Sequence, residues 1–129
     1  MIVRSKAPLR IGLAGGGTDV SPYCDLHTGF ILNSTIDMYA YCTLEVTVNN
    51  EIEFISENLN ENFKYPSSFT LSLDGRFDLY KAIYNRLVLD FVKKPLSFKL
   101  YTYSEAPPGS GLGGSSTLIV AIIKAFSEW

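Results

Sequence analysis

The alternation of apolar and polar residues predicts a chain built from several strands and a few helices. Residues 39–48 alternate over an unusually long stretch rich in Tyr, Thr and Val, which is typical of a strand with one buried face. Pro8 interrupts the first apolar run, so we expect either two short strands or one bent strand at the start of the chain. The expected strands are residues 2–7, 9–14, 30–36, 39–48, 51–55 and 96–103.

Helical periodicity is clearest in residues 76–92, where apolar side chains recur at three- and four-residue spacing and form one stripe. Asp74 is placed to cap this helix, and Pro95 follows its end. Residues 118–126 are expected to form a second, more apolar helix. Residues 20–26 are expected to form a short third helix, with N-cap residues just before it. The stripe consists of Phe77, Tyr80, Ile83, Tyr84, Leu87, Val88 and Phe91.

The connections between these elements predict the fold class. Asn49-Asn50 is a hairpin-turn signal between two β-rich runs, and the polar, Asn-rich residues 57–65 are expected to be a loop. Strands and helices do not alternate regularly, as they would in a doubly wound parallel sheet. We therefore predict an α+β fold in which two helices back a mostly antiparallel sheet.

Composition narrows the functional classes. The chain has 129 residues, of which 47% are hydrophobic and 19% charged, which suits one ordinary globular domain. A formal charge of −2 without a basic run argues against nucleic-acid binding, and no apolar stretch approaches the ~18–20 residues of a membrane span. The first residues lack a signal-peptide core, so we expect a cytoplasmic protein with Cys24 and Cys42 as reduced thiols. The single histidine, His27, lies in a polar segment and is expected at the surface.

The strongest functional signal is a polar, glycine-rich segment, residues 105–117, which runs from a strand-like stretch into the last helix-like stretch. Its glycines remove the β-carbons that would keep a ligand away from the main chain, and three hydroxyl residues follow where a helix should begin. The first turn of a helix has free N–H groups and a positive dipole end, so we expect this segment to bind a nucleotide polyphosphate. The residues concerned are Gly109, Gly111, Gly113 and Gly114, followed by Ser115, Ser116 and Thr117.

Three nucleotide-binding patterns compete for this segment. A GxxxxGK[ST] phosphate loop would need lysine after Gly114, where the sequence has Ser115, so that pattern fails. The dinucleotide pattern GxGxxG matches at Gly109, Gly111 and Gly114, but the acidic residue expected about twenty residues later would lie beyond Trp129. The alternating strand before the segment also suits a half-exposed sheet better than a buried parallel one.

The third pattern is Pro-x-x-Gly-Leu-Gly-[Ser/Gly]-Ser-[Ser/Ala], which residues 108–116 match. This segment resembles the phosphate-binding motif of the GHMP small-molecule kinases, a family that includes galactokinase, homoserine kinase, mevalonate kinase and phosphomevalonate kinase. Gly114 departs from the many members that have serine at this position, and the departure removes one possible hydroxyl contact.

A second segment supports the same resemblance. Residues 8–19, Pro-Leu-Arg-Ile-Gly-Leu-Ala-Gly-Gly-Gly-Thr-Asp, resemble the other signature of these kinases, which in galactokinases reads Pro-Gly-Arg-Val-Asn-Leu-Ile-Gly-Glu-His-Thr-Asp. Gly16 and Gly17 replace the Glu-His pair, as in a branch of sugar kinases that includes heptose 7-phosphate kinases, fucokinases and glucuronokinases. The continuation at residues 29–39 is most similar to the heptose phosphate kinases.

The resemblance implies a fold and a reaction. The implied fold is the family's ribosomal protein S5 domain 2-like architecture, with residues 1–129 as the ATP-binding N-terminal domain of a longer chain. The implied reaction uses ATP and Mg²⁺ to transfer the γ-phosphate to a sugar hydroxyl. In the heptose branch this is the anomeric hydroxyl of D-glycero-D-manno-heptose 7-phosphate. Such a transfer needs charge neutralisation and positioning more than covalent help from the protein.

Each motif residue receives a role through the resemblance. Arg10 aligns with a basic residue beside the transferring phosphate and the acceptor hydroxyl, and Ser115 aligns with the serine that binds magnesium. The sugar is expected to contact Gly16, Gly17, Thr18 and Asp19. The nucleotide is expected to contact Pro108, Gly109, Ser110, Gly111, Leu112, Gly113, Gly114, Ser115, Ser116 and Thr117.

The family's catalytic aspartate belongs to a motif that follows the glycine-rich segment, and so does the acidic residue that completes its magnesium site. No residue here receives those roles, and we expect residues 1–129 alone to be inactive. Three other hypotheses stay open. The first is a fucokinase- or glucuronokinase-type sugar kinase. The second is a catalytically silent sugar and nucleotide sensor on the same fold, and the third is a dinucleotide-dependent oxidoreductase. The sequence also leaves open which sugar and hydroxyl are used and the oligomeric state.

Overall fold

A five-stranded sheet organises the molecule, and the computed structural model describes all of residues 1–129. The pairs β1–β2, β2–β5 and β3–β4 are antiparallel, whereas β3–β5 is parallel. The predicted α+β fold with a mostly antiparallel sheet is therefore confirmed, with one parallel pairing inside it. In the sheet order β1-β2-β5-β3-β4, the strands are β1 (Ile2–Ala14), β2 (Leu32–Val46), β5 (Phe98–Ser104), β3 (Glu51–Ser56) and β4 (Glu61–Pro66).

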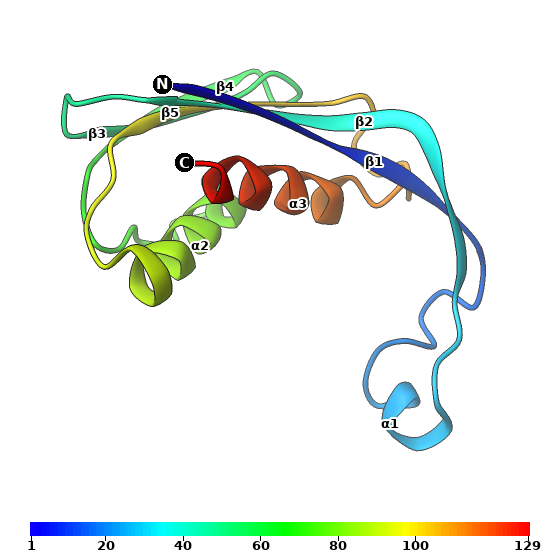
Figure 1. Cartoon of the computed structure of the whole chain (residues 1–129). Coiled ribbons are helices and arrows are strands. Elements are labelled where there is room, and N and C mark those ends of the chain that lie inside the picture. Colours follow the sequence, from blue (N-terminus) through cyan, green and yellow to red (C-terminus); the bar gives the residue numbers. More distant parts are fainter.

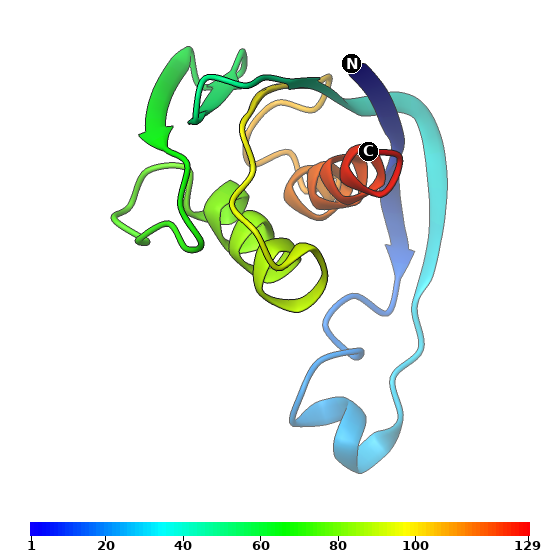
Figure 2. The same ribbon diagram turned by 60° about the vertical axis from the view of Figure 1, so that its left-hand side comes forward.

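Two helical segments cover one face of this sheet, as the sequence predicted (Figures 1 and 2). α2 (Asp78–Leu87) continues into a short π-helical turn, η1 (Val88–Val92), and α3 (Gly114–Ser127) lies beside α2. Aromatic side chains fill the space between sheet and helices, where the ring of Phe98 lies 5.8 Å from that of Tyr84 and 5.1 Å from that of Phe126. The hydrophobic core therefore lies between the helices and the inner face of the sheet.

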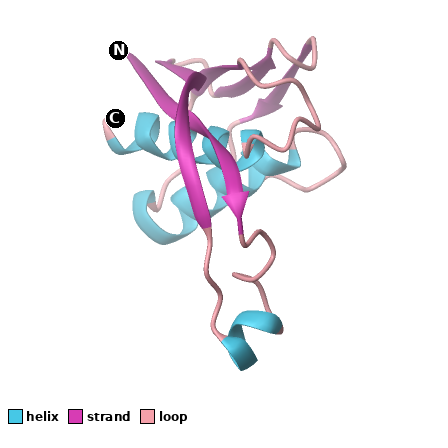
Figure 3. Cartoon of the chain, turned by 90° about the vertical axis from the view of Figure 1, so that its right-hand side faces the viewer, coloured by secondary structure: helices cyan, strands magenta, loops and turns pink.

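Beyond the helices, β1 and β2 continue as a long two-stranded arm (Figures 1 and 3). α1 (Tyr23–His27) lies at the tip of the arm, apart from α2 and α3. Apolar side chains on the arm are exposed, including Leu26 at 74% and Phe30 at 79%. Pro8 does not break β1, which is one continuous strand with a register shift between Pro8 and Arg10. Proline is tolerated there because β1 is an edge strand.

The expected loop at residues 57–65 is wrong, because most of it forms β4. Phe63 pairs with Phe54 of β3 and Tyr65 pairs with Ile52, so the alternating aromatic residues face the core. The asparagines that suggested a loop lie in the turn and on the outer face. The short alternating pattern was therefore hidden by a composition typical of connections.

The expected hairpin at Asn49-Asn50 is also wrong. β5 lies between β2 and β3, so these asparagines connect strands that do not pair. Asn50 adopts a left-handed backbone with φ 56°, which explains the turn-like composition. The side-chain oxygen of Asn49 accepts hydrogen bonds from the hydroxyls of Thr47 at 2.9 Å and Ser97 at 3.0 Å. The connection is thereby tied to the residues just before β5.

The helix boundaries differ from the sequence predictions in their caps. Asp74 does not cap α2, whose N-cap residue is Phe77 without a side-chain cap; the Asp74 carboxylate instead accepts a 2.6 Å hydrogen bond from the ammonium of Lys81. Lys93 ends the helical segment close to the predicted place, with φ 59° and its N–H donated to the carbonyl of Val88. α3 begins at Gly114 rather than at residue 118. None of the helices combines the length and apolar character that a membrane span requires.

Candidate functional site

The glycine-rich segment leaves β5 at Ser104 and enters α3 at Gly114, so it lies at the end of the core where the sheet meets the helix. Its backbone needs glycine, because φ is 77° at Gly109, 73° at Gly111 and 73° at Gly113. No atom of the protein accepts a hydrogen bond from the N–H groups of these three glycines. The segment therefore presents unpaired backbone donors together with the first turn of a helix, which is the arrangement that binds an anion.

The first turn of α3 leaves further groups free. The first bond closing this turn runs from the N–H of Thr117 to the carbonyl of Gly113 at 2.9 Å, and no side chain caps the helix. Ser115 and Ser116 are exposed, and their hydroxyls form no hydrogen bond within the protein. Thr117, by contrast, is buried at 7% exposure. The structure therefore places the two serines at the surface of the predicted site and Thr117 beneath it.

Arg10 lies against the glycine-rich segment, although the two are far apart in sequence. Its backbone N–H donates to the carbonyl of Leu112 at 3.2 Å, which joins β1 to the loop. A β-carbon built on Gly113 would come within 3.2 Å of Nε of Arg10, so the guanidinium side chain runs across that glycine. Arg10 is exposed and forms no salt bridge. A free cation therefore stands beside unpaired backbone donors.

A hollow of about 480 Å³ lies beside this loop. One wall is the glycine-rich segment and the start of α3. The opposite wall comes from the β3–β4 turn and the start of α2, which the sequence did not identify as part of a site. Burial raises the pKa of the Tyr80 phenol in this wall, and its hydroxyl shares a 2.9 Å hydrogen bond with Thr102. The residues of this wall that the sequence did not indicate are Ser56, Asn58, Leu59, Phe77, Leu79 and Tyr80.

The second predicted site segment, residues 16–19, is held in a tight loop between the end of β1 and α1, toward the tip of the arm. The hydroxyl of Thr18 lies 2.7 Å from the carbonyl of Gly15 and 2.9 Å from that of Phe30, and it accepts the N–H of Phe30 at 3.1 Å. A β-carbon on Gly15 would lie 1.9 Å from that same Phe30 carbonyl oxygen, so only glycine fits there. Gly16 and Gly17 have open space around them. The side chain of Asp19 is exposed and without a hydrogen bond.

The structure brings Arg10 to the glycine-rich segment but does not bring residues 16–19 into contact with it. No hydrogen bond joins the two segments, and the chain beyond β1 turns away along the arm (Figure 3). His27 is exposed near the tip of the arm, as predicted for a surface histidine. No group of three or more His, Cys, Asp or Glu side chains could hold a metal ion. The role of the Ser115 hydroxyl as a magnesium ligand stays a prediction.

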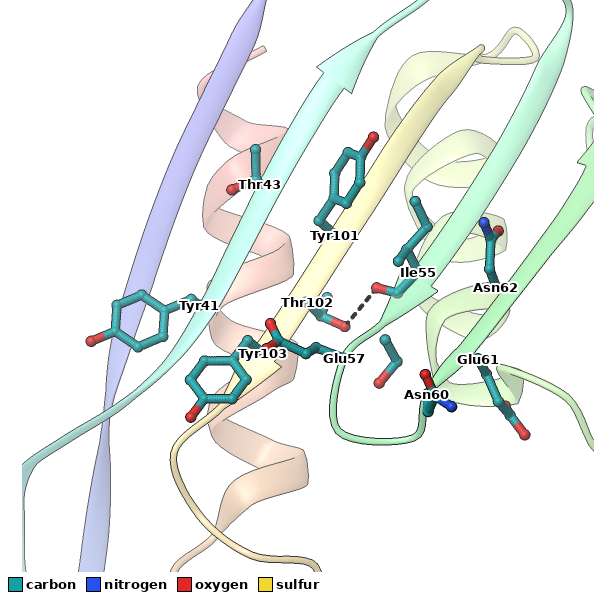
Figure 4. A pocket seen from close by; sticks show the side chains of 11 residues that line it. Tyr41, Thr43, Ile55, Glu57, Asn60, Glu61, Asn62, Tyr101, Thr102 and Tyr103 are labelled. Carbon is teal, nitrogen blue, oxygen red and sulfur yellow. Dashed lines mark hydrogen bonds between the residues drawn. The ribbon is translucent and has the colours of Figure 1, made fainter.

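The open face of the sheet carries a separate hollow of about 450 Å³ (Figure 4). Tyr41 and Tyr103 line it, with stacked rings 6.2 Å apart, and Glu57 lies beside Tyr103. None of the predicted site residues is in this hollow. The candidate site is therefore the one at the glycine-rich segment.

Residues 78–129 match the family model of the GHMP kinases N-terminal domain, a family of small-molecule kinases. The resemblance to this family is thereby confirmed. The chain is 56% identical over 127 residues to D-glycero-alpha-D-manno-heptose 7-phosphate kinase of Campylobacter jejuni. The aligned region covers 98% of this chain and 38% of that protein. These matches do not favour the dinucleotide-dependent alternative.

Solved structures show the same similarity to heptose phosphate kinases. The crystal structure of a D-glycero-D-manno-heptose 1-phosphate kinase from Bacteroides thetaiotaomicron has a TM-score of 0.93 at 53% identity, over 100% of this chain and 42% of that chain. The mevalonate kinase of Methanococcus jannaschii has a TM-score of 0.76 at 21% identity, which shows a shared fold alone. The chain spans about two fifths of the length of the heptose phosphate kinases it matches.

Proposed function

We propose that this chain is the nucleotide-binding part of an ATP-dependent heptose phosphate kinase. The observation that carries the proposal is the contact between Arg10 and Gly113, because it combines a free cation with a loop of unpaired N–H groups. Phosphoryl transfer depends on this kind of positioned positive charge and backbone donors. We expect the protein to act in the cytoplasm, where ATP is available.

The residues present suit a nucleotide with a magnesium ion. N–H groups of the glycine-rich segment would hold the phosphate oxygens, and the exposed hydroxyl of Ser115 would provide one oxygen ligand to Mg²⁺, which keeps several of its waters. The bound metal–nucleotide supplies the phosphoryl group and part of the charge neutralisation. Arg10 would stabilise the negative charge that develops between the donor phosphate and the acceptor hydroxyl. Buried Thr117 would support the helix rather than touch the nucleotide.

Residues 16–19 are proposed to recognise the sugar. Asp19 is exposed with unused acceptors, and Gly16 and Gly17 leave room beside it. The hydroxyl of Thr18 already bonds the main chain at both ends of the loop, so we assign Thr18 to holding the loop in shape. Glycines in place of bulkier side chains would admit a larger or phosphorylated sugar.

The proposed acceptor is the anomeric hydroxyl of D-glycero-D-manno-heptose 7-phosphate. Support comes from the 56% identity to the Campylobacter jejuni heptose 7-phosphate kinase. The 53% identity to the Bacteroides thetaiotaomicron heptose 1-phosphate kinase points the same way, although the two proteins are named for different phosphates. A kinase that phosphorylates the anomeric hydroxyl, at carbon 1, of a heptose 7-phosphate would account for both names.

The decisive test is a substrate panel with the full-length protein. ADP release and the phosphorylated product are measured with heptose 7-phosphate, free heptose, fucose and galactose, with and without Mg²⁺. We expect turnover of heptose 7-phosphate that requires Mg²⁺ and yields a doubly phosphorylated heptose. Turnover of fucose with heptose 7-phosphate inert would overturn the substrate assignment. Saturable ATP binding without turnover of any sugar would favour a sensor instead.

A further inference from the structure

Within the glycine-rich segment, residues 107–111 form no hydrogen bond to the rest of the protein. Between Pro107 and Gly111, the one internal bond runs from the N–H of Ser110 to the carbonyl of Pro107 at 3.1 Å. Its far end is fixed by the bond from Arg10 to Leu112 and by α3. A segment so rich in glycine has many accessible conformations, so its position depends strongly on how its two ends are held.

The other end of the glycine-rich segment follows Ser104, the last residue of β5, which is held by a side chain that extends the hydrogen bonding of the sheet. The parallel pairing of β3 with β5 ends at Ser56 and Thr102, and one more bond follows from the N–H of Glu57 to the carbonyl of Thr102 at 3.1 Å. Figure 4 shows this edge, where the hydroxyl of Thr102 also donates to the carbonyl of Ile55. The chain then turns toward β4, so no backbone group of β3 is available for Ser104.

Asn58 replaces the missing backbone partner. Its side-chain NH₂ donates to the carbonyl of Ser104 at 2.8 Å, and its side-chain oxygen accepts the N–H of Ser104 at 2.7 Å. A carboxamide carries a donor and an acceptor like those of a peptide group, so one side chain satisfies both main-chain groups of Ser104. Ser104 in turn accepts the N–H of Ala106 on its hydroxyl at 3.2 Å, at the first turn of the glycine-rich segment.

Glu105 holds the same junction from the opposite side. Its N–H donates to the carbonyl of Tyr39 at 3.0 Å, and its carboxylate accepts the N–H of Tyr39 at 2.5 Å. The last residue of β5 and the residue after it are therefore each bound twice, one to the β3–β4 turn and the other to β2. Asn58 also lies next to Leu59, and both line the hollow that faces the glycine-rich segment.

We propose that Asn58 is a positioning residue for nucleotide binding. This inference rests on the proposed function. Asn58 fixes the start of the glycine-rich segment relative to the wall formed by the β3–β4 turn. A nucleotide whose phosphates lie on the loop would reach the opposite wall with its base, so the distance between loop and wall would affect affinity and phosphate alignment. Asn58 sets that distance without contacting the reacting atoms.

The experiment compares Asn58→Ala, Asn58→Asp and Asn62→Ala in the full-length protein. Asn58→Asp keeps the size of the side chain and the acceptor for Ser104, but it loses the donor and places a carboxylate against a carbonyl. Asn62→Ala is the matched control, because Asn62 donates to Glu53 at 3.0 Å on the outer face and does not line the nucleotide hollow. Steady-state kinetics are measured with ATP and with the sugar varied separately.

We expect both Asn58 variants to lose about tenfold or more in kcat/KM for ATP, with KM for the sugar unchanged. Asn62→Ala should match the wild type. Hydrogen–deuterium exchange of the nucleotide-free protein should show faster exchange in residues 104–113 of the Asn58 variants and unchanged exchange in α3. A variant that is merely less stable, with kinetics for ATP unchanged in its folded fraction, would overturn the proposal.

The two measurements separate this inference from the proposed function. If the wild-type protein transfers no phosphate to any sugar, the proposed function fails and the exchange data alone decide the role of Asn58. If the wild type is active and Asn58→Ala matches it in KM for ATP and in exchange at residues 104–113, the positioning role fails alone.

Discussion

Arg10 reaches the glycine-rich segment with an unpaired guanidinium, so its charge is available to a ligand rather than neutralised by the protein. Arg10→Met should lower kcat about 10²-fold or more, as the removal of one donor to a developing charge usually does. Arg10→Lys should recover only part of the rate, because an ammonium lacks the planar fork of a guanidinium. The measurement is steady-state turnover of the full-length protein.

Arg4 provides the control for this prediction, since it is an exposed arginine on the same strand and lies away from the loop. Arg4→Met should leave kcat close to the wild-type value. The melting temperature of both variants should be unchanged, because neither side chain is buried. An equal loss of rate in the two variants would mean that general charge, rather than the position of Arg10, sets the activity.

Ser115 is the residue through which this chain is proposed to reach the magnesium ion. Its hydroxyl is exposed and unbonded, so Ser115→Ala should not disturb the fold. The variant should need more Mg²⁺ for half-maximal activity and should have a lower kcat at saturation. Ser127→Ala, at the other end of α3, removes a hydroxyl that bonds the carbonyl of Lys124 and serves as the control. A normal Mg²⁺ titration for Ser115→Ala would remove this residue from the metal site.

The reactivity of Cys42 tests whether this side of β2 is packed against the core, where the Cys42 thiol is buried. Burial raises the pKa of the Cys42 thiol to about 12, and the neighbouring Ser5 hydroxyl offsets only part of that effect. At about pH 8 the thiol should therefore stay protonated and unreactive, whereas the partly exposed Cys24 should be alkylated. Peptide mapping after iodoacetamide treatment measures both sites. Labelling of Cys42 in the native protein at the rate of Cys24 would contradict this packing.

At the scale of single elements, the start of α2 depends on a buried lysine. The side chain of Lys81 is fully buried, its ammonium bonds the carboxylate of Asp74, and it lies 4.5 Å from the centre of the Tyr65 ring. Burial works to lower the pKa of Lys81, but the hydrogen bond to Asp74 and the nearby Tyr65 hydroxyl raise it overall. The pKa of Asp74 is lowered, mainly by the Lys81 hydrogen bond.

Asp74→Asn should therefore destabilise the protein more than Lys81→Met. The first change leaves a buried ammonium without its counter-charge, whereas the second removes the charge that needs one. The free energies of unfolding of both variants measure this order. Because the folded-state pKa of Asp74 is lowered, its contribution should be present above the ordinary aspartate value of about 3.9 and should be lost as the pH falls through the folded-state value. A stability difference between wild type and Asp74→Asn that persists at lower pH would contradict the ion pair.

For single helices and strands, local sequence patterns were sufficient to predict some elements and not others. The stripe at residues 76–92 predicted α2 and η1, because only a helix brings residues at three- and four-residue spacing onto one face over several turns. β4 was missed because its alternating pattern is short and Asn-rich. Asn49-Asn50 gave a correct turn but a wrong pairing, since a local signal cannot say that β5, formed by residues far along the chain, inserts between β2 and β3.

At the scale of the whole molecule, one wall of the candidate site, the glycine-rich segment, could be predicted from the sequence, whereas the opposite wall could not. The unusual run of glycines and hydroxyls at residues 105–117 predicted an anion-binding loop from sequence, and the structure shows positive φ at Gly109, Gly111 and Gly113 just before α3. The opposite wall, with Leu59 and Leu79, carries no chemical signature of its own. Its place in the site follows only from the sheet order, which sets the β3–β4 turn beside the end of β5.

The whole-molecule prediction concerns residues 1–129 expressed alone. Arg10 and the glycine-rich segment are already assembled in this chain, but no cluster of acidic residues could complete a magnesium site. Phosphoryl transfer needs the metal, a positioned acceptor and charge stabilisation together. We therefore expect these residues to fold, to bind Mg²⁺–nucleotide weakly in calorimetry, and to release no ADP in the presence of heptose 7-phosphate.

The control is the full-length protein under the same conditions, and the same calorimetry with Arg10→Met tests whether any binding uses the assembled loop. Weak binding that Arg10→Met reduces would place the nucleotide at the glycine-rich segment of the isolated domain. Sugar-dependent ADP release by residues 1–129 would contradict the prediction, because the carboxylates required for transfer would then have to lie within this chain. Asp19, exposed between the end of β1 and α1, would be the first of them to replace.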